Sequence, residues 1–220
     1  MFLAHFALGL AAKRAAPRVS LAAWFAAAQL ADLLWPLFLI AGVEHVRIAP
    51  GITAFTPLDF YDYPVTHSLA ADAAWAATFA GVWYLAARRR NPDITRTAWL
   101  LAAAVLSHWI LDAVAHRPDM PVLPHGPYVG LGLWYSVPAT LAVELAVFAA
   151  GVLLYARGGF AGARRISFWL LIAFLTIAYF GAAFGPPPPD VRTLAWSALA
   201  LWLLLPWAMW VERKAGGNAG

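Results

Sequence analysis

Six long apolar stretches occupy most of this chain, and they constrain its fold more than any other feature. They cover residues 21–43, 66–87, 97–115, 136–155, 166–184 and 193–210. A helix rises about 1.5 Å per residue, so roughly 17–25 apolar residues cross the hydrocarbon core of a bilayer, which is about 30 Å thick. The sequence therefore predicts an all-α, polytopic transmembrane helix bundle with about six spans.

The composition supports a membrane protein and argues against a soluble domain. Hydrophobic residues make up 63% of the chain and charged residues 12%, and the mean hydropathy is +0.69. Soluble domains contain about 45–50% apolar and about 25% charged residues. Cysteine is absent, so any bound metal must be held by nitrogen and oxygen ligands.

The first dozen residues, "MFLAHFALGLAA", form a further apolar stretch. This stretch is too short to span a bilayer, so we expect a half-helix or a re-entrant segment. Lys13, Arg14 and Arg18 follow the apolar run, whereas a secretory signal peptide carries its positive charge in front. We therefore expect the segment to be retained.

The basic residues indicate how the bundle is oriented. In the six-span arrangement 12 of the 15 lie on one side, which predicts that this side is cytoplasmic. They are Lys13, Arg14, Arg18, Arg88, Arg89, Arg90, Arg96, Arg157, Arg164, Arg165, Arg213 and Lys214. The N-terminal basic loop and the C-terminus are thus expected on the cytoplasmic side of a bacterial-type inner membrane. No basic patch is interleaved with stacking aromatic residues, which argues against nucleic-acid binding.

Ionisable residues are distributed unevenly along the chain. Residues 166–184 and 193–211 contain no Asp, Glu, His, Lys or Arg. We therefore expect a membrane-embedded site within residues 1–155. Residues 156–220 are expected to form a scaffold of two transmembrane helices with a C-terminal tail.

Six ionisable residues of the first part are expected to meet in the middle and outer half of the bilayer: His5, Asp32, His67, His108, Asp112 and Glu144. Asp32 and His108 lie about 16 Å from the cytoplasmic ends of their spans, and Asp112 lies about 22 Å from that end. A charge at the centre of a span costs about 2.5–3.5 kcal/mol on insertion scales, so such residues usually face an interior, a partner or water. Their convergence indicates a shared site.

Two of these residues have the spacing of metal ligands. In "LSHWILDAVAH", residues 106–116, His108 and Asp112 are four positions apart and project from one helical face. Imidazole and carboxylate together suit zinc, manganese or iron. His116 continues this face as a candidate further ligand. An equally weighted alternative is that His108 and Asp112 pair with each other or with polar groups on neighbouring helices.

Four motifs resemble the YdjM-like family, inner-membrane proteins described as metal-dependent hydrolases and distant relatives of zinc-dependent phospholipase C. The motifs are His5, Asp32 in "QLADLLWP", "THSL" at residues 66–69 and "SHWILD" at residues 107–112. The resemblance covers roughly residues 1 to 150. Family members carry further acidic and histidine residues beside the position of Asp32, and "HRGxTHS" where this chain has "YDYPVTHS". The resemblance therefore implies a smaller ligand set here.

An enzyme of this kind would hold one or two divalent ions, zinc or alternatively manganese, through His5, Asp32, His67, His108 and Asp112. Such a metal lowers the pKa of a bound water toward about 7, and the resulting hydroxide attacks a phosphoester or an acyl carbonyl. Asp112 and Glu144 are the expected catalytic carboxylates, with Glu144 acting as general base or orienting a metal-bound histidine. The expected substrate is a lipid or phosphoester in the outer half of the membrane.

The sequence alone leaves several assignments open. Asp59 and Asp62 belong to the outer loop 44–65, which either extends the site as a lid or is a solvated interfacial loop. Asp72 either supports the site or pairs with a neighbouring helix, and Ser68 either orients His67 or caps its helix. An ion- or proton-coupled transporter is a second functional class. A third is a non-catalytic assembly protein whose polar cluster only fixes helix packing.

Overall fold

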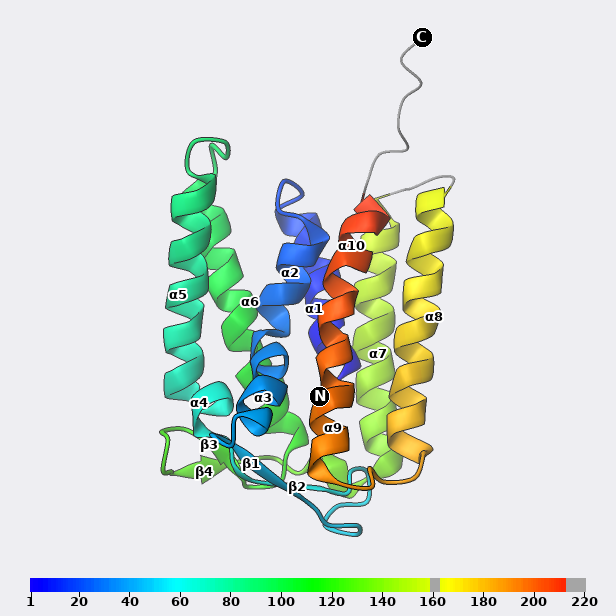
Figure 1. Ribbon diagram of the computed structural model, residues 1–220. Helices are drawn as coiled ribbons and strands as arrows, with labels where there is room; N and C mark the ends of the chain where they lie inside the picture. The colour runs from blue at the N-terminus through cyan, green and yellow to red at the C-terminus, as the bar shows by residue number, and fades with distance from the viewer. Residues whose placement is uncertain (159–162, 213–220) are drawn as a thin grey trace.

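The computed structural model describes residues 1–158 and 163–212, which are mostly helical (Figure 1). The N-terminal half contains α1 (Leu3–Ala15), α2 (Leu21–Ala28), α3 (Leu30–Ile40), α4 (Pro64–His67) and α5 (Leu69–Ala87). The rest contains α6 (Ile94–Ala115), η1 (Leu133–Tyr135), α7 (Val137–Ala156), α8 (Ala163–Phe184), α9 (Val191–Ala198), η2 (Leu199–Leu203) and α10 (Leu204–Glu212). The predominance of helix agrees with the all-α prediction.

Within the described residues, four helical segments are long and apolar enough to cross a membrane. They are Ile94–Ala115, Val137–Ala156, Arg164–Phe184 and Val191–Glu212. The pair α2 and α3 makes a fifth if the two helices, bent by 58°, count as one span. The expected number of about six stays a prediction, because the stretch 66–87 is not among these segments.

That stretch is divided by Ser68, which has an extended backbone between α4 and α5. The hydroxyl of Ser68 accepts a hydrogen bond from the backbone N–H of Ala71 at 3.1 Å. It also donates to the carbonyl of Pro64 at 2.6 Å. Ser68 is therefore the N-cap of α5, in agreement with one of its two expected roles. The long helix begins at Leu69, and His67 lies at the end of a separate short turn of helix.

Helix α1 lies inside the bundle and is 13 residues long, too short to cross a bilayer. It packs against α7, α2 and α6. Its approach to α7 depends on Gly151, since a Cβ built there would lie 2.5 Å from the backbone oxygen of Ala7. Small residues at such a crossing let two helix backbones come close together. This contact holds His5 in the interior.

The break between α2 and α3 lies at Gln29. Ala28 is the last residue of α2, and the last carbonyls of a helix lack partners within that helix. Pro36 lies inside α3 and has no N–H to continue the helical hydrogen-bond pattern there. The bend directs Asp32 and the carbonyl of Ala28 toward α6, as the contacts below show.

Two short antiparallel hairpins cover one end of the bundle (Figure 1). Strand β1 (His45–Ile48) pairs with β2 (Leu58–Asp62), and β3 (Met120–Pro121) pairs with β4 (Tyr128–Val129). The sequence did not predict these strands. The basic loop between α5 and α6 lies at the opposite end. Arg213, Lys214 and the C-terminal tail, on which the predicted location of the C-terminus depends, lie outside the described residues.

The C-terminal helices pack against the N-terminal part of the chain. Helix α9 contacts α3, and α10 contacts both α2 and α8. One apolar cluster includes Phe6 of α1, Phe25 of α2, Phe148 of α7 and Leu171 of α8. Residues from both sides of the predicted boundary at 155 therefore share a core.

Candidate metal centre

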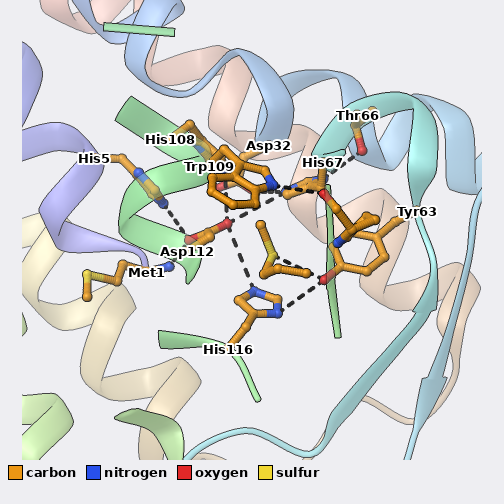
Figure 2. Close-up of polar contacts among 12 residues, drawn as sticks. Met1, His5, Asp32, Tyr63, Thr66, His67, His108, Trp109, Asp112 and His116 are labelled. Atoms are coloured by element: carbon orange, nitrogen blue, oxygen red, sulfur yellow. Dashed lines mark hydrogen bonds and ion pairs between the residues drawn. The ribbon is translucent and has the colours of Figure 1, made fainter. Parts of the chain in front are cut away.

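The five predicted metal ligands come together from four helices (Figure 2). His5 lies on α1, Asp32 on α3, His67 at the end of α4, and His108 and Asp112 on α6. The three histidines and Asp112 are buried, whereas Asp32 is partly exposed. Asp112 lies at the centre of the polar contacts in Figure 2. Two groups of residues could each hold an ion: His67 with His108 and Asp112, and His5 with Asp32 and His108.

The spacing between the imidazole and carboxylate atoms suits ligands of a common ion. Nε2 of His108 lies 3.3 Å from Oδ2 of Asp112 and 3.8 Å from Oδ1 of Asp32. Nε2 of His67 lies 3.9 Å from Oδ2 of Asp112 and 3.5 Å from Oδ1 of Asp32. Two ligands bound tetrahedrally at about 2.1 Å from one zinc ion lie about 3.4 Å apart. The four separations between imidazole nitrogen and carboxylate oxygen range from 3.3 to 3.9 Å, which is from close to that value to about 0.5 Å above it.

The tautomer of His108 is set by the helix break. Its Nδ1 lies 2.9 Å from the carbonyl of Ala28. A carbonyl only accepts, so Nδ1 carries the proton and donates it. In the neutral ring that metal binding requires, Nε2 would be a lone pair directed at the carboxylates, and it has no hydrogen-bond partner in the described part of the chain. Metal-bound histidines almost always have this arrangement, with the other ring nitrogen bound to a carbonyl or carboxylate.

The tautomer of His67 is set through Thr66 and Glu44. Nδ1 of His67 lies 2.6 Å from the hydroxyl oxygen of Thr66, and that hydroxyl donates to Oε2 of Glu44 at 2.7 Å. The hydroxyl has a single proton, so it accepts from Nδ1 of His67, and in the neutral ring Nε2 would be the lone pair. Oε1 of Glu44 accepts from the backbone N–H groups of Val65 and Thr66 at 2.7 and 2.8 Å.

Sequence reasoning missed Glu44, which is 1% exposed. It lies at the start of the outer loop, 22 positions before Thr66. The sequence feature that could have indicated such a residue is the threonine directly before His67. Its hydroxyl can accept a hydrogen bond from the histidine ring, and its own proton then needs an acceptor. Nothing in the sequence indicated which carboxylate would provide it.

His5 contacts Asp112 and His108. Its Nε2 lies 3.0 Å from Oδ1 of Asp112, which also pairs with the amino group of Met1. Its ring stacks on that of His108 with centroids 3.8 Å apart. Nδ1 of His5 has no hydrogen-bond partner among the described residues. His5 therefore orients Asp112 through one nitrogen and has the other available for an ion.

His116 lies beside the cluster, directly after α6. Its Nε2 is 3.9 Å from Oδ2 of Asp112, and its Nδ1 is 3.1 Å from Oδ1 of Asp119. Burial lowers the pKa of His116 below its ordinary value, which favours the neutral ring that a metal ligand requires. The carboxylate of Asp119 also accepts from Arg117 at 2.8 Å. His116 has the orientation expected of a further ligand.

Glu144 has a different environment from the predicted ligands. Its carboxylate accepts hydrogen bonds from the backbone N–H of Phe2, at 3.0 and 3.1 Å, and from that of Ala4 at 3.2 Å. These donors belong to the first turn of α1 and the residue before it, where backbone N–H groups lack helical partners. Glu144 thus anchors α1, and its predicted role as general base stays a prediction.

The remaining acidic candidates divide between the interior and the hairpin. Asp72 is 1% exposed, and neither of its oxygens has a hydrogen-bond partner among the described residues. Asp59 pairs with Arg47 and with Arg117, and Asp62 pairs with His45. Asp59 and Asp62 therefore stabilise the hairpin that covers the site and contribute no ligand.

A cavity of about 210 Å³ lies beside the cluster. Its polar wall contains Asp32, His67, Asp112, His116 and Glu144. The rest of its wall is mainly aromatic or apolar and includes Phe2, Trp35, Phe55, Phe60, Trp134, Tyr179, Ala182 and Ala183. The last three named belong to α8, a helix expected to be only scaffold. The cluster is thus adjacent to a space that can hold a small polar group and an apolar chain.

The chain was compared with family models, curated proteins and solved structures. No family model, curated protein or solved structure matches this chain.

Proposed function

We propose that this protein is an integral membrane metal-dependent hydrolase that acts on a lipid or phosphoester substrate. One observation carries the proposal. His67 and His108 each have Nδ1 hydrogen-bonded to an acceptor that fixes the tautomer, while Nε2 faces the carboxylates of Asp32 and Asp112. In the neutral rings both Nε2 lone pairs would face negative charge, an arrangement that a role in helix packing alone does not explain. A metal ion between them would satisfy all four groups.

The residues present fit a divalent ion, for which we propose zinc, with manganese as the alternative. His67, His108, Asp32 and Asp112 would hold it, and His5 and His116 could complete the shell or hold a second ion. When bound, such an ion supplies a Lewis acid and lowers the pKa of water. The aromatic wall of the cavity limits access of bulk water, and Glu144 is near enough to line the same space.

We further propose six spans in a bacterial-type inner membrane, with the basic end cytoplasmic and the hairpins outside. This arrangement counts α2 with α3 as one span and α5 as another, while α1 remains inside the bundle. The basic loop between α5 and α6 and the hairpins lie at opposite ends, which supports it. The site, which the hairpins cover, would then face the outer half of the membrane. The motifs shared with the YdjM-like family are consistent with this assignment.

The first test is the metal content of the purified protein, measured by inductively coupled plasma mass spectrometry. We expect about one or more equivalents of zinc or manganese in the wild type, and loss of that metal in His108→Ala and Asp112→Ala. The matched control is Asp62→Asn, because the ion-pair partner of Asp62 in the described part of the chain is the exposed His45 of the hairpin. A folded wild type that binds no metal even after reconstitution would reject the proposal.

The second test is bond cleavage. Detergent-solubilised protein should release product from a lipid phosphoester, and Asp112→Asn should abolish the release. Uptake of an ion by proteoliposomes without any cleavage would instead assign the site to a transporter.

A further inference from the structure

Three residues that line the cavity beside the metal centre each carry a buried hydrogen-bond donor that has no partner among the described residues. The donors are Nε1 of Trp35, Nε1 of Trp134 and the hydroxyl of Tyr179. The three residues are 6%, 9% and 2% exposed. They come from α3, η1 and α8, so three separate elements direct a donor-bearing residue to one space.

Buried donors in native proteins nearly always have an acceptor. Nε1 of Trp24 also lacks one among the described residues, but Trp24 does not line this cavity. Trp35, Trp134 and Tyr179 all line this cavity. A ligand bound there could therefore accept from all three.

The ring of Tyr179 is held in place independently of its hydroxyl. It stacks on Phe2 with centroids 6.4 Å apart and contacts Phe55 at 5.8 Å. A phenylalanine at this position would keep both contacts. The hydroxyl is thus not required for packing.

We propose that this cavity binds the phosphoryl head group of a phospholipid, and that Trp35, Trp134 and Tyr179 donate hydrogen bonds to its oxygens. The inference rests on the proposed function, because the metal would supply the positive charge that the neutral donors lack. A phosphoryl group offers several acceptor oxygens, so it can occupy three donors and a metal together. An acyl ester carbonyl offers a single strong acceptor, which leaves donors unpaired.

The apolar part of the wall accounts for the lipid. The side chains of Phe2, Phe55 and Ala183 form part of the apolar wall of the cavity, and Ala182, which also lines it, is exposed on α8. Helix α8 is one of the segments apolar enough to lie in a bilayer. An acyl chain can therefore extend from the head group along this wall toward the membrane.

The test is isothermal titration calorimetry of the purified, detergent-solubilised protein with three probes. They are 1-oleoyl-lysophosphatidic acid, mono-oleoylglycerol with the same chain but no phosphate, and inorganic phosphate. We expect the wild type to bind the lysophosphatidic acid most tightly. Tyr179→Phe and Trp134→Phe should each weaken that binding about five- to tenfold, as for loss of one hydrogen bond, without changing affinity for mono-oleoylglycerol or metal content.

Two control variants remove the same chemical groups elsewhere. Tyr84→Phe alters an exposed hydroxyl on α5, and Trp24→Phe alters a buried indole outside the cavity. Both should bind the lysophosphatidic acid like the wild type. Equal loss in Trp24→Phe and Trp134→Phe would attribute the effect to general destabilisation and overturn the proposal.

The other outcomes separate this inference from the proposed function. A wild type that holds metal but binds both lipids equally, or a Tyr179→Phe variant with unchanged affinity, would overturn the head-group site and leave the hydrolase proposal standing. Donor-dependent binding of the lysophosphatidic acid by a protein without metal would uphold the three donors as the head-group site, overturn the metal's part in it and reject the hydrolase. Tight binding of inorganic phosphate with no gain from the acyl chain would overturn the lipid assignment.

Discussion

The hydroxyl oxygen of Thr66 accepts a hydrogen bond from Nδ1 of the adjacent His67 at 2.6 Å. This is possible because the proton of the hydroxyl is donated to Glu44. Three residues, two of them from a short helix and one from the start of the outer loop, thereby determine which nitrogen of His67 faces the candidate metal centre. The orientation of this candidate ligand is decided by residues outside the candidate groups.

Glu44→Gln tests this relationship. The glutamine amide can donate to the Thr66 hydroxyl oxygen and compete with Nδ1 of His67, so the preferred tautomer is lost. We expect metal affinity, measured by competition with a chromophoric chelator, to fall about 10- to 100-fold, as for other groups that orient metal ligands. Thr66→Val should act in the same direction, and Asp62→Asn in the neighbouring hairpin should have no effect. Wild-type affinity in both Glu44→Gln and Thr66→Val would contradict the assigned tautomer.

Gly151→Ala tests the packing that positions α1. The added Cβ would lie 2.5 Å from the backbone oxygen of Ala7, so α1 and α7 must move apart. We expect a loss of about 1–3 kcal/mol in the free energy of unfolding, as for overpacking of a core, measured in detergent. Gly181→Ala is the control, since no atom lies within 4 Å of a Cβ built at that helical position. Equal stability of the two variants would contradict the close approach.

Metal removal should destabilise the protein. A ligand that binds only the folded state adds about 2.7 kcal/mol at a concentration 100 times its Kd. Treatment with a chelator should therefore lower the thermal unfolding temperature, and added zinc should restore it. His108→Ala should unfold at one temperature with or without zinc, because it lacks a ligand of both candidate groups. A zinc-dependent shift that persists in this variant would assign the ion to another site.

The proposed topology can be tested by cysteine labelling, since the natural chain contains no cysteine. Leu123 is exposed in the loop between β3 and β4, and Arg89 is exposed in the loop between α5 and α6. In intact spheroplasts, an impermeant maleimide should label Leu123→Cys at once and Arg89→Cys only after lysis. The reverse order would invert the orientation.

The sequence by itself determined the helical class and most of the candidate ligands. Apolar runs specify helices locally, and the four-residue spacing of His108 and Asp112 places them on one face whatever surrounds them. The depths of His5, Asp32 and His67 followed from counting residues along predicted spans. The structure brings these residues together in one cluster.

Only the tertiary structure decided how the cluster is supported. The carbonyl of Ala28 reaches His108 across 80 positions, and Glu44 reaches Thr66 across 22. Tyr179 lines the cavity from the stretch 166–184, which contains no Asp, Glu, His, Lys or Arg, and the covering hairpins form where a loop was expected. Each of these features depends on contacts between separate segments of the chain. Helical periodicity could not predict them, because it relates only neighbours within a few turns of one helix. The residues that can bind a metal can therefore be predicted from local sequence. Their tautomers and the cavity beside them result from packing.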